Sequence, residues 1–470
     1  MKYKFCGSIS FLILTFFIVG CQSYEPAPLD SGSYRNALET RLIEIEPVTE
    51  FANRMNTVAN SPVTFDITDG ISSEEGEVIA LFYNPELRLA RLEAGVALAN
   101  YETAGLWEDP VFGFDGAEIS SPSAPFEFGL TGNFTIPISG RLKVEKTRAG
   151  SAYETSMREL VNDEWNLRAN VRSKWAHWTS AKMEALIIED VVEQLQHIIT
   201  IADSLLEAGE INRVEHRLLR VELANSKVQQ AEALLAQQKA EFELLQLLGL
   251  PPNNVEALIP EFPTIATITV PDETARIIDA NTELAISFSK YQTAEESLRL
   301  EIKKQYPDIV IGSGYGSEFN DHRVLFGLSV PLSIWNRNQA GIAKAKAKRE
   351  VARAEAETTF ARLDRELALA NATLRLLQTQ NAYYINDIVP LLEQQTRDIN
   401  AIVELGEVDT FILLETITRQ HDAKHRLLEL QVAELDAKIK VLNIIGPEYQ
   451  MNPTPINREL SQEDTLGGVQ

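Results

Sequence analysis

The chain repeats itself at long range, and this repeat restricts the folds that it can adopt. Gly209 lies in LLEAGEINRVEHRLL, and Gly406 lies in IVELGEVDTFILLET, 197 residues further on (406 − 209). The same offset separates Asn84 of NPEL from Asn281 of NTEL. It also relates Pro110 to Pro307 and Gly249 to Gly446. A chain of 470 residues would otherwise suggest two or three unrelated domains, so the repeat predicts one body built from two similar halves.

The charge balance is acidic, with 43 Lys and Arg against 68 Asp and Glu and a net charge of −25. A nucleic-acid partner would require basic patches, so we expect none. An acidic, water-filled structure would favour cations instead. An ordinary solvated acidic surface is the alternative, and the composition does not separate the two.

The N-terminus has the pattern of a targeting segment. Lys2 and Lys4 precede an apolar run from Phe5 to Val19, which is shorter than the 20 or so residues of a membrane helix. The run ends in IVGC at residues 18–21, which resembles the lipobox of bacterial lipoproteins and implies lipid attachment at Cys21. Gln22 after the cysteine implies the outer membrane. An ordinary signal peptide with an incidental cysteine is the alternative.

Six segments follow from composition and patterning. Cleavage would remove Cys6 and leave one cysteine, so no intrachain disulfide is expected. The expected segments are a lipoprotein signal peptide (1–20), an extended N-terminal arm (21–71), a first repeat (72–250), a Pro-rich linker (251–271), a second repeat (272–447) and a disordered tail (448–470). Within the arm, a short helix is expected near residues 34–45.

Each repeat reads as a helix, a β-hairpin and two long helices. In the first repeat, Ser72 and Glu75 have capping-box spacing and start a helix that is expected to run to about residue 105. Strands over 111–120 and 126–138 lead to helices over 141–203 and 214–248. A heptad seam marks the last of these helices: Val214, Leu218, Val221, Asn225 and Val228.

The second repeat follows the same plan. It predicts a helix over 272–305, strands over 308–318 and 324–334, an unbroken helix over 336–402 and a last helix that ends at Gly446. The fold class is therefore mainly α with a small β part, in which long antiparallel coiled-coil helices form an α-barrel. The hairpins supply four strands.

One strand alternates cleanly between two faces. One face carries Phe126, Phe128, Leu130, Phe134 and Ile136, and the other carries Glu127, Gly129, Thr131, Asn133 and Thr135. The apolar face is very uniform for a solvated hairpin, although a half-buried soluble hairpin is the alternative. No apolar run of transmembrane-helix length remains after the signal, so a membrane crossing would use the strands. Four strands are fewer than the smallest barrel of about eight, which predicts a transmembrane β-barrel shared by several chains.

In its repeats, its pattern of helices and strands and its N-terminal segment, the chain resembles the TolC family of outer-membrane efflux channels. The residues that carry the resemblance are IVGC at 18–21, SSEEGEVIALFYNPEL at 72–87, GLPP at 249–252, FGLSVPLSIWNRNQAGIAKAKA at 326–347 and the two stretches around Gly209 and Gly406. The likeness is nearest to the lipoprotein channels of heavy-metal and cation efflux systems. The family implies a passive homotrimeric duct with twelve strands in the outer membrane and twelve helical segments in the periplasm. It also implies a periplasmic adaptor protein and an inner-membrane pump as partners.

A structural or adhesive periplasmic coiled-coil lipoprotein is the alternative function. An enzyme is not expected, because the sequence has no nucleophile elbow, phosphate loop, HExxH or Cys-x-x-Cys motif. No cofactor or metal site is expected either. The run Gly312, Gly314, Gly316 is not a dinucleotide motif, since no helix follows it, and the three glycines should share one strand face.

The two repeated tips gather carboxylates, which by resemblance would line a narrow entrance. The set is Glu207, Glu210, Glu215, Glu404, Glu407, Asp409 and Glu415. The entrance residues expected from it are Glu210, Glu215, Glu407, Asp409 and Glu415, while the acidic pair of the family corresponds to Ile412 and Glu415 here. Threefold copies around an axis would attract cations. Alternatively, these are solvated acids at helix starts, where the helix dipole favours them.

His421 and His425 are four residues apart on the last predicted helix, a spacing that can place two imidazoles on one metal. No third ligand completes the set at helical spacing. A polar pair at a helix interface is therefore the favoured interpretation.

Overall fold

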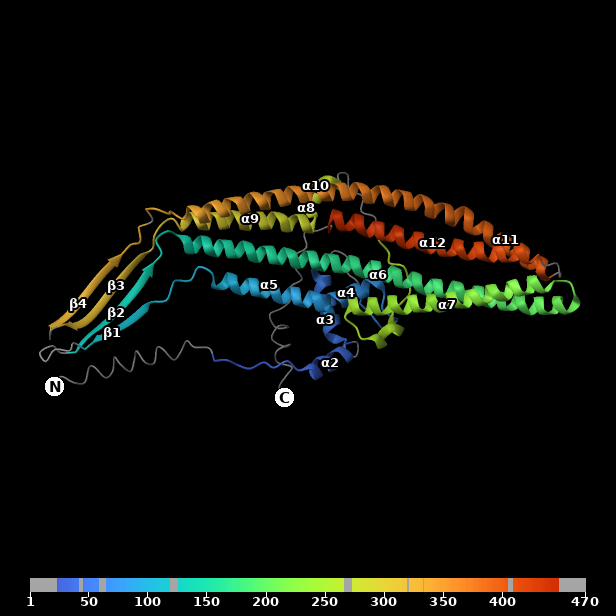
Figure 1. Ribbon diagram of the computed structural model, residues 1–470, viewed down its shortest axis with the longest axis horizontal. Helices are drawn as coiled ribbons and strands as arrows, with labels where there is room; N and C mark the ends of the chain where they lie inside the picture. The colour runs from blue at the N-terminus through green and yellow to red at the C-terminus, as the bar shows by residue number, and fades with distance from the viewer. Residues whose placement is uncertain are drawn as a thin grey trace. The chain divides into compact units, whose positions relative to one another are not determined.

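The computed structural model describes residues 23–41, 45–58, 65–118, 126–265, 273–318, 321–332, 334–404 and 409–447. The chain divides into two compact units, Met1–Ile45 and Glu46–Gln470. In the first unit, helix α2 (Ser31–Glu39) starts where the Asp30 carboxylate accepts a hydrogen bond from the Gly32 N–H at 2.9 Å. It begins before the helix expected near residues 34–45. Cys21, its signal segment and the tail from residue 448 lie outside the described residues. All further elements belong to the second unit (Figure 1).

The first repeat opens with three helices: α3 (Glu46–Val58), α4 (Ser73–Tyr83) and α5 (Pro85–Thr103). The capping box of Ser72 and Glu75 is confirmed, since each side chain bonds to the backbone N–H of the other residue. Two expectations were wrong. Helix α3 was expected as extended chain, and the helix from Ser72 stops at Tyr83 because Asn84 caps the start of α5 and Pro85 occupies its first turn.

The strands form one antiparallel sheet in chain order: β1 (Val111–Ala117), β2 (Glu127–Ile136), β3 (Ile309–Glu318) and β4 (Asp321–Ser329). β4 starts and ends earlier than the predicted 324–334. It starts earlier because Asp321 pairs with Glu318 and His322 stacks on Tyr315, with ring centroids 5.8 Å apart. It ends before Pro331, which has no N–H to donate to the ladder.

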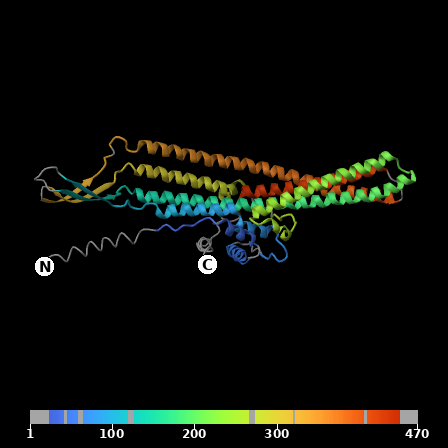
Figure 2. The same cartoon turned by 60° about the horizontal axis from the view of Figure 1, so that its bottom comes forward.

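The long helices are α6 (Arg141–Ala208), α7 (Arg213–Leu248), α9 (Thr282–Lys303), α10 (Gln339–Tyr383), α11 (Val389–Glu404) and α12 (Thr410–Ile445). A short 3₁₀ segment η1 (Pro252–Ala257) lies between the repeats. Helix α8 (Glu273–Ala280) opens the second repeat, so the single helix expected over 272–305 was wrong: Asn281 ends α8 and caps the start of α9. α6 packs against α5, α7, α9 and α12, and α10 packs against α9 and α12. Figures 1 and 2 show these helices side by side, with the sheet at one end and, at the other, the α6–α7 turn, the end of α11 and the start of α12. Among the described residues, no helix has an apolar stretch long enough to cross a membrane.

The helix predicted over 336–402 is interrupted by a π-helical turn, η2 (Tyr384–Ile388). The cause is Pro390, which the periodicity alone had not marked. A proline inside an α-helix has no N–H to donate, and its ring clashes with the carbonyl four residues earlier, here that of Asn386. The wider π turn accommodates both effects, so the helix direction continues into α11.

Two of the largest fully buried side chains lie where α4 packs against α6. Trp175 and Trp178 are fully buried and meet edge to face, with ring centroids 5.7 Å apart. The Trp175 indole N–H donates to the Ile259 carbonyl at 3.0 Å, which ties η1 to the helices. A Cβ on Gly76 would lie 2.6 Å from the Trp175 ring, so only glycine allows this crossing.

Candidate functional site

The two faces of the sheet differ as the alternation predicted. Paired residues of neighbouring strands point to the same side, so the register groups Phe114, Leu130, Tyr315 and Val324 on one face. The opposite face carries Gly113, Thr131, Gly314 and Leu325 at the same level. The three glycines of β3 share this second face, as expected. The sheet therefore has one apolar, aromatic face and one face of small and polar side chains.

The turn between α6 and α7 is fixed by its backbone. Gly209 takes a left-handed conformation (φ 80°), and the following N–H of Glu210 donates to the Leu205 carbonyl at 2.9 Å. Asn212 then caps α7, accepting hydrogen bonds from the N–H groups of Val214 (2.9 Å) and Glu215 (3.0 Å). Gly209 is thus required by the reversal of the chain between α6 and α7.

Two of the predicted entrance carboxylates are helix caps. Glu215 completes a capping box by accepting a hydrogen bond from the Asn212 N–H at 3.2 Å. Asp409 caps α12, accepting from the N–H groups of Phe411 (3.0 Å) and Ile412 (3.2 Å). Another predicted entrance carboxylate, Glu415, forms an ion pair with Arg419 one helical turn further along α12 at 2.5 Å. Much of the tip acidity is therefore engaged locally in each chain.

Two further carboxylates lie at the first tip. Glu207 and Glu210 are exposed beside the first turn. Glu404 ends α11, and Glu407 lies outside the described residues. Ile412 is half exposed. Sequence reasoning missed one tip contact, His216 with Asp203 at 2.6 Å, which joins α6 to α7.

The two tips pack on each other through a shared apolar cluster. Leu413 and Ile417 of α12 are buried against the α6–α7 pair. Their neighbours in this cluster are Leu195, Ile198, Ala202, Ile211 and Leu219. Residues from both repeats therefore meet at one end of the second unit, as Figure 1 shows on its right-hand side.

His421 and His425 find a carboxylate that the sequence spacing could not reveal. Glu184 of α6 lies 3.0 Å from His425 Nδ1 and 3.9 Å from His421 Nε2. Burial opposes protonation of His425, but the hydrogen bond and charge of Glu184, with Glu429 and Asp422, raise its pKa above the usual histidine value. The described residues contain no group of three or more His, Cys, Asp or Glu side chains arranged to hold a metal ion. The arrangement is that of an ion pair between α6 and α12.

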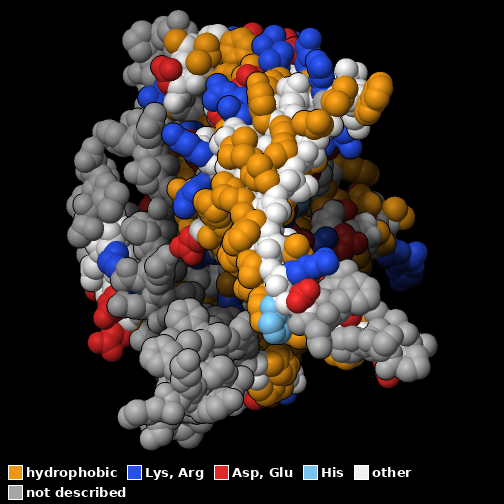
Figure 3. All heavy atoms as spheres, turned by 90° about the vertical axis from the view of Figure 1, so that its left-hand side faces the viewer, with side chains coloured by type: hydrophobic (Ala, Val, Ile, Leu, Met, Phe, Trp, Pro, Cys, Tyr) orange, Lys and Arg blue, Asp and Glu red, His pale blue; other side chains and the backbone are white. Residues whose placement is uncertain are grey.

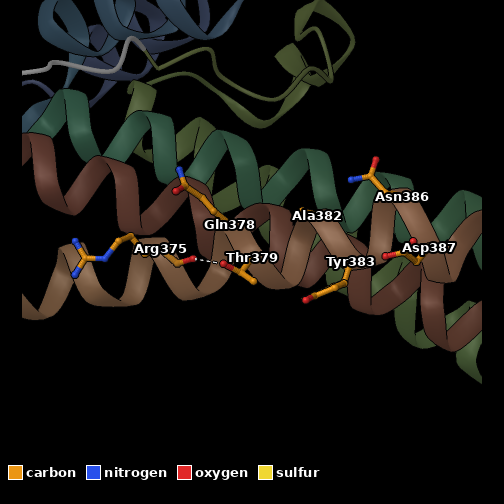
Figure 4. Close-up of a pocket in the computed structure, with 7 residues that line it drawn as sticks. All are labelled: Arg375, Gln378, Thr379, Ala382, Tyr383, Asn386 and Asp387. Atoms are coloured by element: carbon orange, nitrogen blue, oxygen red, sulfur yellow. Dashed lines mark hydrogen bonds between the residues drawn. The ribbon is translucent and has the colours of Figure 1, made fainter.

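A cavity of about 570 Å³ opens on α10 and η2, and all of its lining side chains come from this one helical segment. Figure 4 shows them following one another along the helix, with the Thr379 hydroxyl donating to the Arg375 carbonyl. Ligand pockets usually have polar groups converging from several elements. This cavity is therefore an open groove on the helix surface and has no features of an active site.

The predicted heptad seam of α7 does not face α6. Val214, Val221 and Val228 are 74%, 55% and 59% exposed. The residues of α7 that are buried lie on another side of the helix and include Leu219 and Ser226. The expectation of a seam was correct in pattern, but the described part of this chain leaves it uncovered.

Comparisons with known proteins agree with this architecture. The family model described as "Outer membrane efflux protein" matches residues 79–250. The cobalt-zinc-cadmium resistance protein CzcC of Cupriavidus metallidurans is 23% identical over 332 residues, which are 70% of this chain and 76% of that protein. The solved structure of CusC gives a TM-score of 0.68 at 18% identity, covering 83% of this chain and 97% of CusC. The open-state MtrE outer membrane channel of Neisseria gonorrhoeae gives a TM-score of 0.67 at 16% identity, covering 82% of this chain and 93% of MtrE.

The paired helical hairpins and the four-stranded sheet define the fold of an outer-membrane efflux channel. Residues 79–250 of the chain match the outer membrane efflux protein family, and the fold is that of the solved outer-membrane channels. The family model and the MtrE structure describe an efflux protein and an outer membrane channel, and neither describes an enzyme.

Proposed function

We propose that three copies of this chain assemble into a passive efflux duct, with a shared β-barrel in the outer membrane and an α-helical tunnel in the periplasm. The observation that carries the proposal is the uncovered heptad seam on α7. A coiled-coil seam requires a partner helix, because exposed valines and leucines at every third and fourth residue gain their stability only by packing. Leu235 and Phe242 extend this seam and are 67% and 51% exposed.

The sheet supports the same proposal from the other end of the unit. Among the described residues, β1 and β4 each pair with only one neighbouring strand. A strand edge within lipid would leave backbone groups without hydrogen bonds, so sheets in membranes close into barrels. Three copies would supply twelve strands and remove both edges. The open groove on α10 and η2 offers a further surface for a neighbouring copy.

Oligomeric state tests the proposal. Native mass spectrometry of the detergent-solubilised protein should give a trimer, and the double variant Val221→Glu, Val228→Glu should shift it toward monomer. The control is Gln229→Glu with Gln238→Glu, two exposed positions of α7 that gain the same charge beside the seam. A wild-type monomer, or equal trimer content in both double variants, would refute the α7 seam as the contact.

The cargo that we propose is a metal cation. The relative from Cupriavidus metallidurans is named for cobalt, zinc and cadmium resistance, and this chain carries a net charge of −25. An acidic lumen would concentrate cations. Deleting the gene should raise sensitivity to zinc, cobalt or cadmium ions, and unchanged tolerance to all three would contradict a metal cargo.

A complete export route would also need a periplasmic adaptor and an inner-membrane pump, which we propose as partners. Their capture by cross-linking to the tip helices, from cells exposed to metal, tests this part of the proposal. Recovery of the channel alone under these conditions would count against it.

The tip carboxylates Glu210, Glu215, Glu407, Asp409 and Glu415 are proposed to lie at the duct entrance.

We further propose that Cys21 carries a lipid anchor. Cys21→Ser should abolish lipid attachment, yet the protein should still require detergent for extraction because the barrel holds it in the membrane. A soluble periplasmic protein after this change would contradict a membrane-inserted barrel.

A further inference from the structure

The charge of this acidic chain is unevenly distributed. Residues 336–349, which enter α10 directly after the sheet, contain Arg337, Lys344, Lys346, Lys348 and Arg349 and no acidic residue. Residues 141–148, at the start of α6, contain four basic residues and one acidic residue. Both segments adjoin the same end of the sheet, because β2 leads into α6 and β4 leads into α10. The net charge of −25 therefore conceals a basic region next to the strands.

Part of this basic region is bound within the chain. Arg141 pairs with Asp308 at 2.9 Å and Glu108 at 2.8 Å, and Arg349 pairs with Glu350 at 2.5 Å. In contrast, Lys143, Arg337, Lys344 and Lys346 are exposed and form no salt bridge with any described residue. We name these four residues the basic collar. Their charges are available to a partner outside the chain.

Exposed aromatic side chains lie at the same level. Trp107 (64% exposed) precedes β1, Tyr306 (58%) precedes β3 and Trp335 (91%) follows β4. The register places these three strand ends together, since Val111 pairs with Asn133, Ile136 with Ile309 and Val310 with Ser329. Figure 3 looks at the sheet end and shows its hydrophobic side chains bordered by Lys and Arg. Trp and Tyr concentrate where a protein passes from hydrocarbon to headgroups.

The distance from the sheet determines which basic side chains can reach the headgroup layer. Lys344 and Lys346 lie five and seven residues after the start of α10 at Gln339, which is about 8–11 Å along the helix. The headgroup region is about 5–8 Å deep on each side of a bilayer, and a lysine extends its ammonium several ångströms along the surface. Lys143 is the third residue of α6 and lies closer still. All three can place a charge among headgroups, whereas residues from about Arg353 onward lie too deep in the aqueous phase.

We propose that the basic collar binds anionic phospholipid headgroups of the leaflet that faces the helices, and that it selects these lipids for the first shell around the sheet. The inference rests on the proposed membrane insertion of the sheet and goes beyond it by assigning a lipid class to named side chains. Charge complementarity favours this occupant, since lysines near a membrane surface attract anionic lipid and lose this attraction with increasing salt. It also explains how a strongly acidic chain lies against an anionic leaflet without repulsion.

The test is tryptophan quenching in vesicles of phosphatidylcholine mixed with phosphatidylglycerol, in which one of the two lipids is brominated. Trp107 and Trp335 report on the headgroup level, because Trp175 and Trp178 are buried. Trp165 is half-buried but lies 24 residues after the start of α6 at Arg141, about 36 Å along the helix. The wild-type protein should show stronger quenching by brominated phosphatidylglycerol than by the same fraction of brominated phosphatidylcholine. Raising the salt concentration to 0.5 M should reduce this difference.

The variant Lys143→Gln, Lys344→Gln, Lys346→Gln should lower the preference for phosphatidylglycerol about fivefold or more at low salt. The matched control is Arg220→Gln, Lys227→Gln, Lys239→Gln on α7, which removes the same charge from exposed positions far from the sheet. It should keep the preference of the wild type. Inorganic phosphate at millimolar concentration should not compete, and if it does, the collar binds free anions instead of a lipid surface.

The outcomes separate the two proposals. If neither brominated lipid quenches the wild-type protein, the sheet does not enter the bilayer and the proposed function fails together with this inference. If both lipids quench equally, the sheet is inserted but the collar does not select lipids. An equal loss of preference in the collar variant and the α7 control would attribute the effect to net charge and overturn the role of the named lysines.

Discussion

The side-chain amides of Asn84 and Asn281, 197 residues apart, make the same tertiary hydrogen bond. Asn84 Nδ2 donates to the Leu247 carbonyl at 2.8 Å, and Asn281 Nδ2 donates to the Ile444 carbonyl at 2.8 Å. Both acceptors lie in the last turn of a long helix, α7 or α12, where carbonyls have no partner within the helix. Each asparagine is buried and also caps the helix that follows it. One residue type therefore closes two helix ends in each repeat.

The first prediction follows from this dual role. Asn84→Ala should lower the free energy of unfolding by about 2–3 kcal/mol, since it removes an N-cap worth about 1 kcal/mol and leaves a buried carbonyl unpaired. Asn84→Asp should cost at least as much, because the carboxylate keeps the cap to the Leu87 N–H but places a buried negative charge against the Leu247 carbonyl oxygen, to which it cannot donate. Denaturant unfolding in detergent measures both. Asn100→Ala, at an exposed position of α5, serves as the control and should stay within about 0.5 kcal/mol of the wild type.

The second prediction concerns the two faces of β2. Leu130→Arg should block membrane assembly, because Leu130 lies on the apolar face between Phe114 and Tyr315 and a lipid-facing arginine costs about 2–4 kcal/mol near the midplane. Thr131→Arg should assemble, since Thr131 lies on the other face between Gly113 and Gly314, where there is room for a long side chain. Membrane fractionation and heat-modifiable gel mobility distinguish the two. Equal assembly of both variants would mean that the faces are assigned incorrectly.

The third prediction is a pH dependence at the contact between α6 and α12. The pKa of His425 is raised in the folded chain, with Glu184 opposing the effect of burial. A raised pKa means that protonated His425 stabilises the fold fully below its unfolded value of about 6.5, and that this stabilisation is lost as pH rises through the folded pKa. The melting temperature of the wild type should therefore exceed that of His425→Asn by more at pH 5.5 than at pH 8.5.

The neighbouring charges support this pH window. The hydrogen bond from Arg426 lowers the pKa of Glu429 despite burial, so Glu429 remains ionised throughout the range tested. His421, Asp422 and Lys424 also lie on this part of α12. His197→Asn, at an exposed position of α6, is the control and should change the melting temperature equally at both pH values. A pH-independent difference for His425→Asn would show that the imidazole acts only by packing.

Most helices and strands could be predicted from the sequence, but the contacts between segments that are distant in the chain could not. The Asn84-Pro85 dipeptide is a recognisable helix boundary. In the second repeat Asn281 is followed by Thr282 and not by proline, yet one helix ends and the next begins at the same place. The shared cause is a hydrogen bond to a carbonyl 163 residues further along the chain, which no local pattern reveals. Glu184 is likewise 237 residues (421 − 184) before His421, so helical spacing alone could not supply the carboxylate.

The tips show a different limit of sequence reasoning. Their glycine, asparagine and aspartate signals predicted two reversals, and the structure has the Gly209 turn and the Asp409 cap. The same carboxylates were also expected to line an entrance by resemblance. A capping acid and an entrance acid have the same sequence pattern, because both occur at helix starts. Only the hydrogen bonds of Glu215 and Asp409 distinguish a structural contribution from an available charge.

The last prediction separates these two contributions at the tips. Asp409→Ala should destabilise the α12 start by about 1 kcal/mol, whereas Asp409→Asn should be nearly neutral because asparagine caps a helix equally well. Both changes remove the same charge. If the carboxylate also attracts cations, the two variants should lower cation selectivity equally in planar bilayers, although only one of them is less stable.

Glu407→Gln combined with Glu415→Gln should reduce cation selectivity and block by multivalent cations further, since three copies of each carboxylate would be neutralised in a trimer. Assembly should be unaffected, because Glu415 is exposed and its pair with Arg419 is a surface ion pair of small energetic value. The control is Glu189→Gln with Glu193→Gln, exposed on α6 more than ten residues before its end. If single-channel selectivity and divalent block match the wild type in the tip variant, these acids are solvated turn residues and the entrance of the duct lies elsewhere.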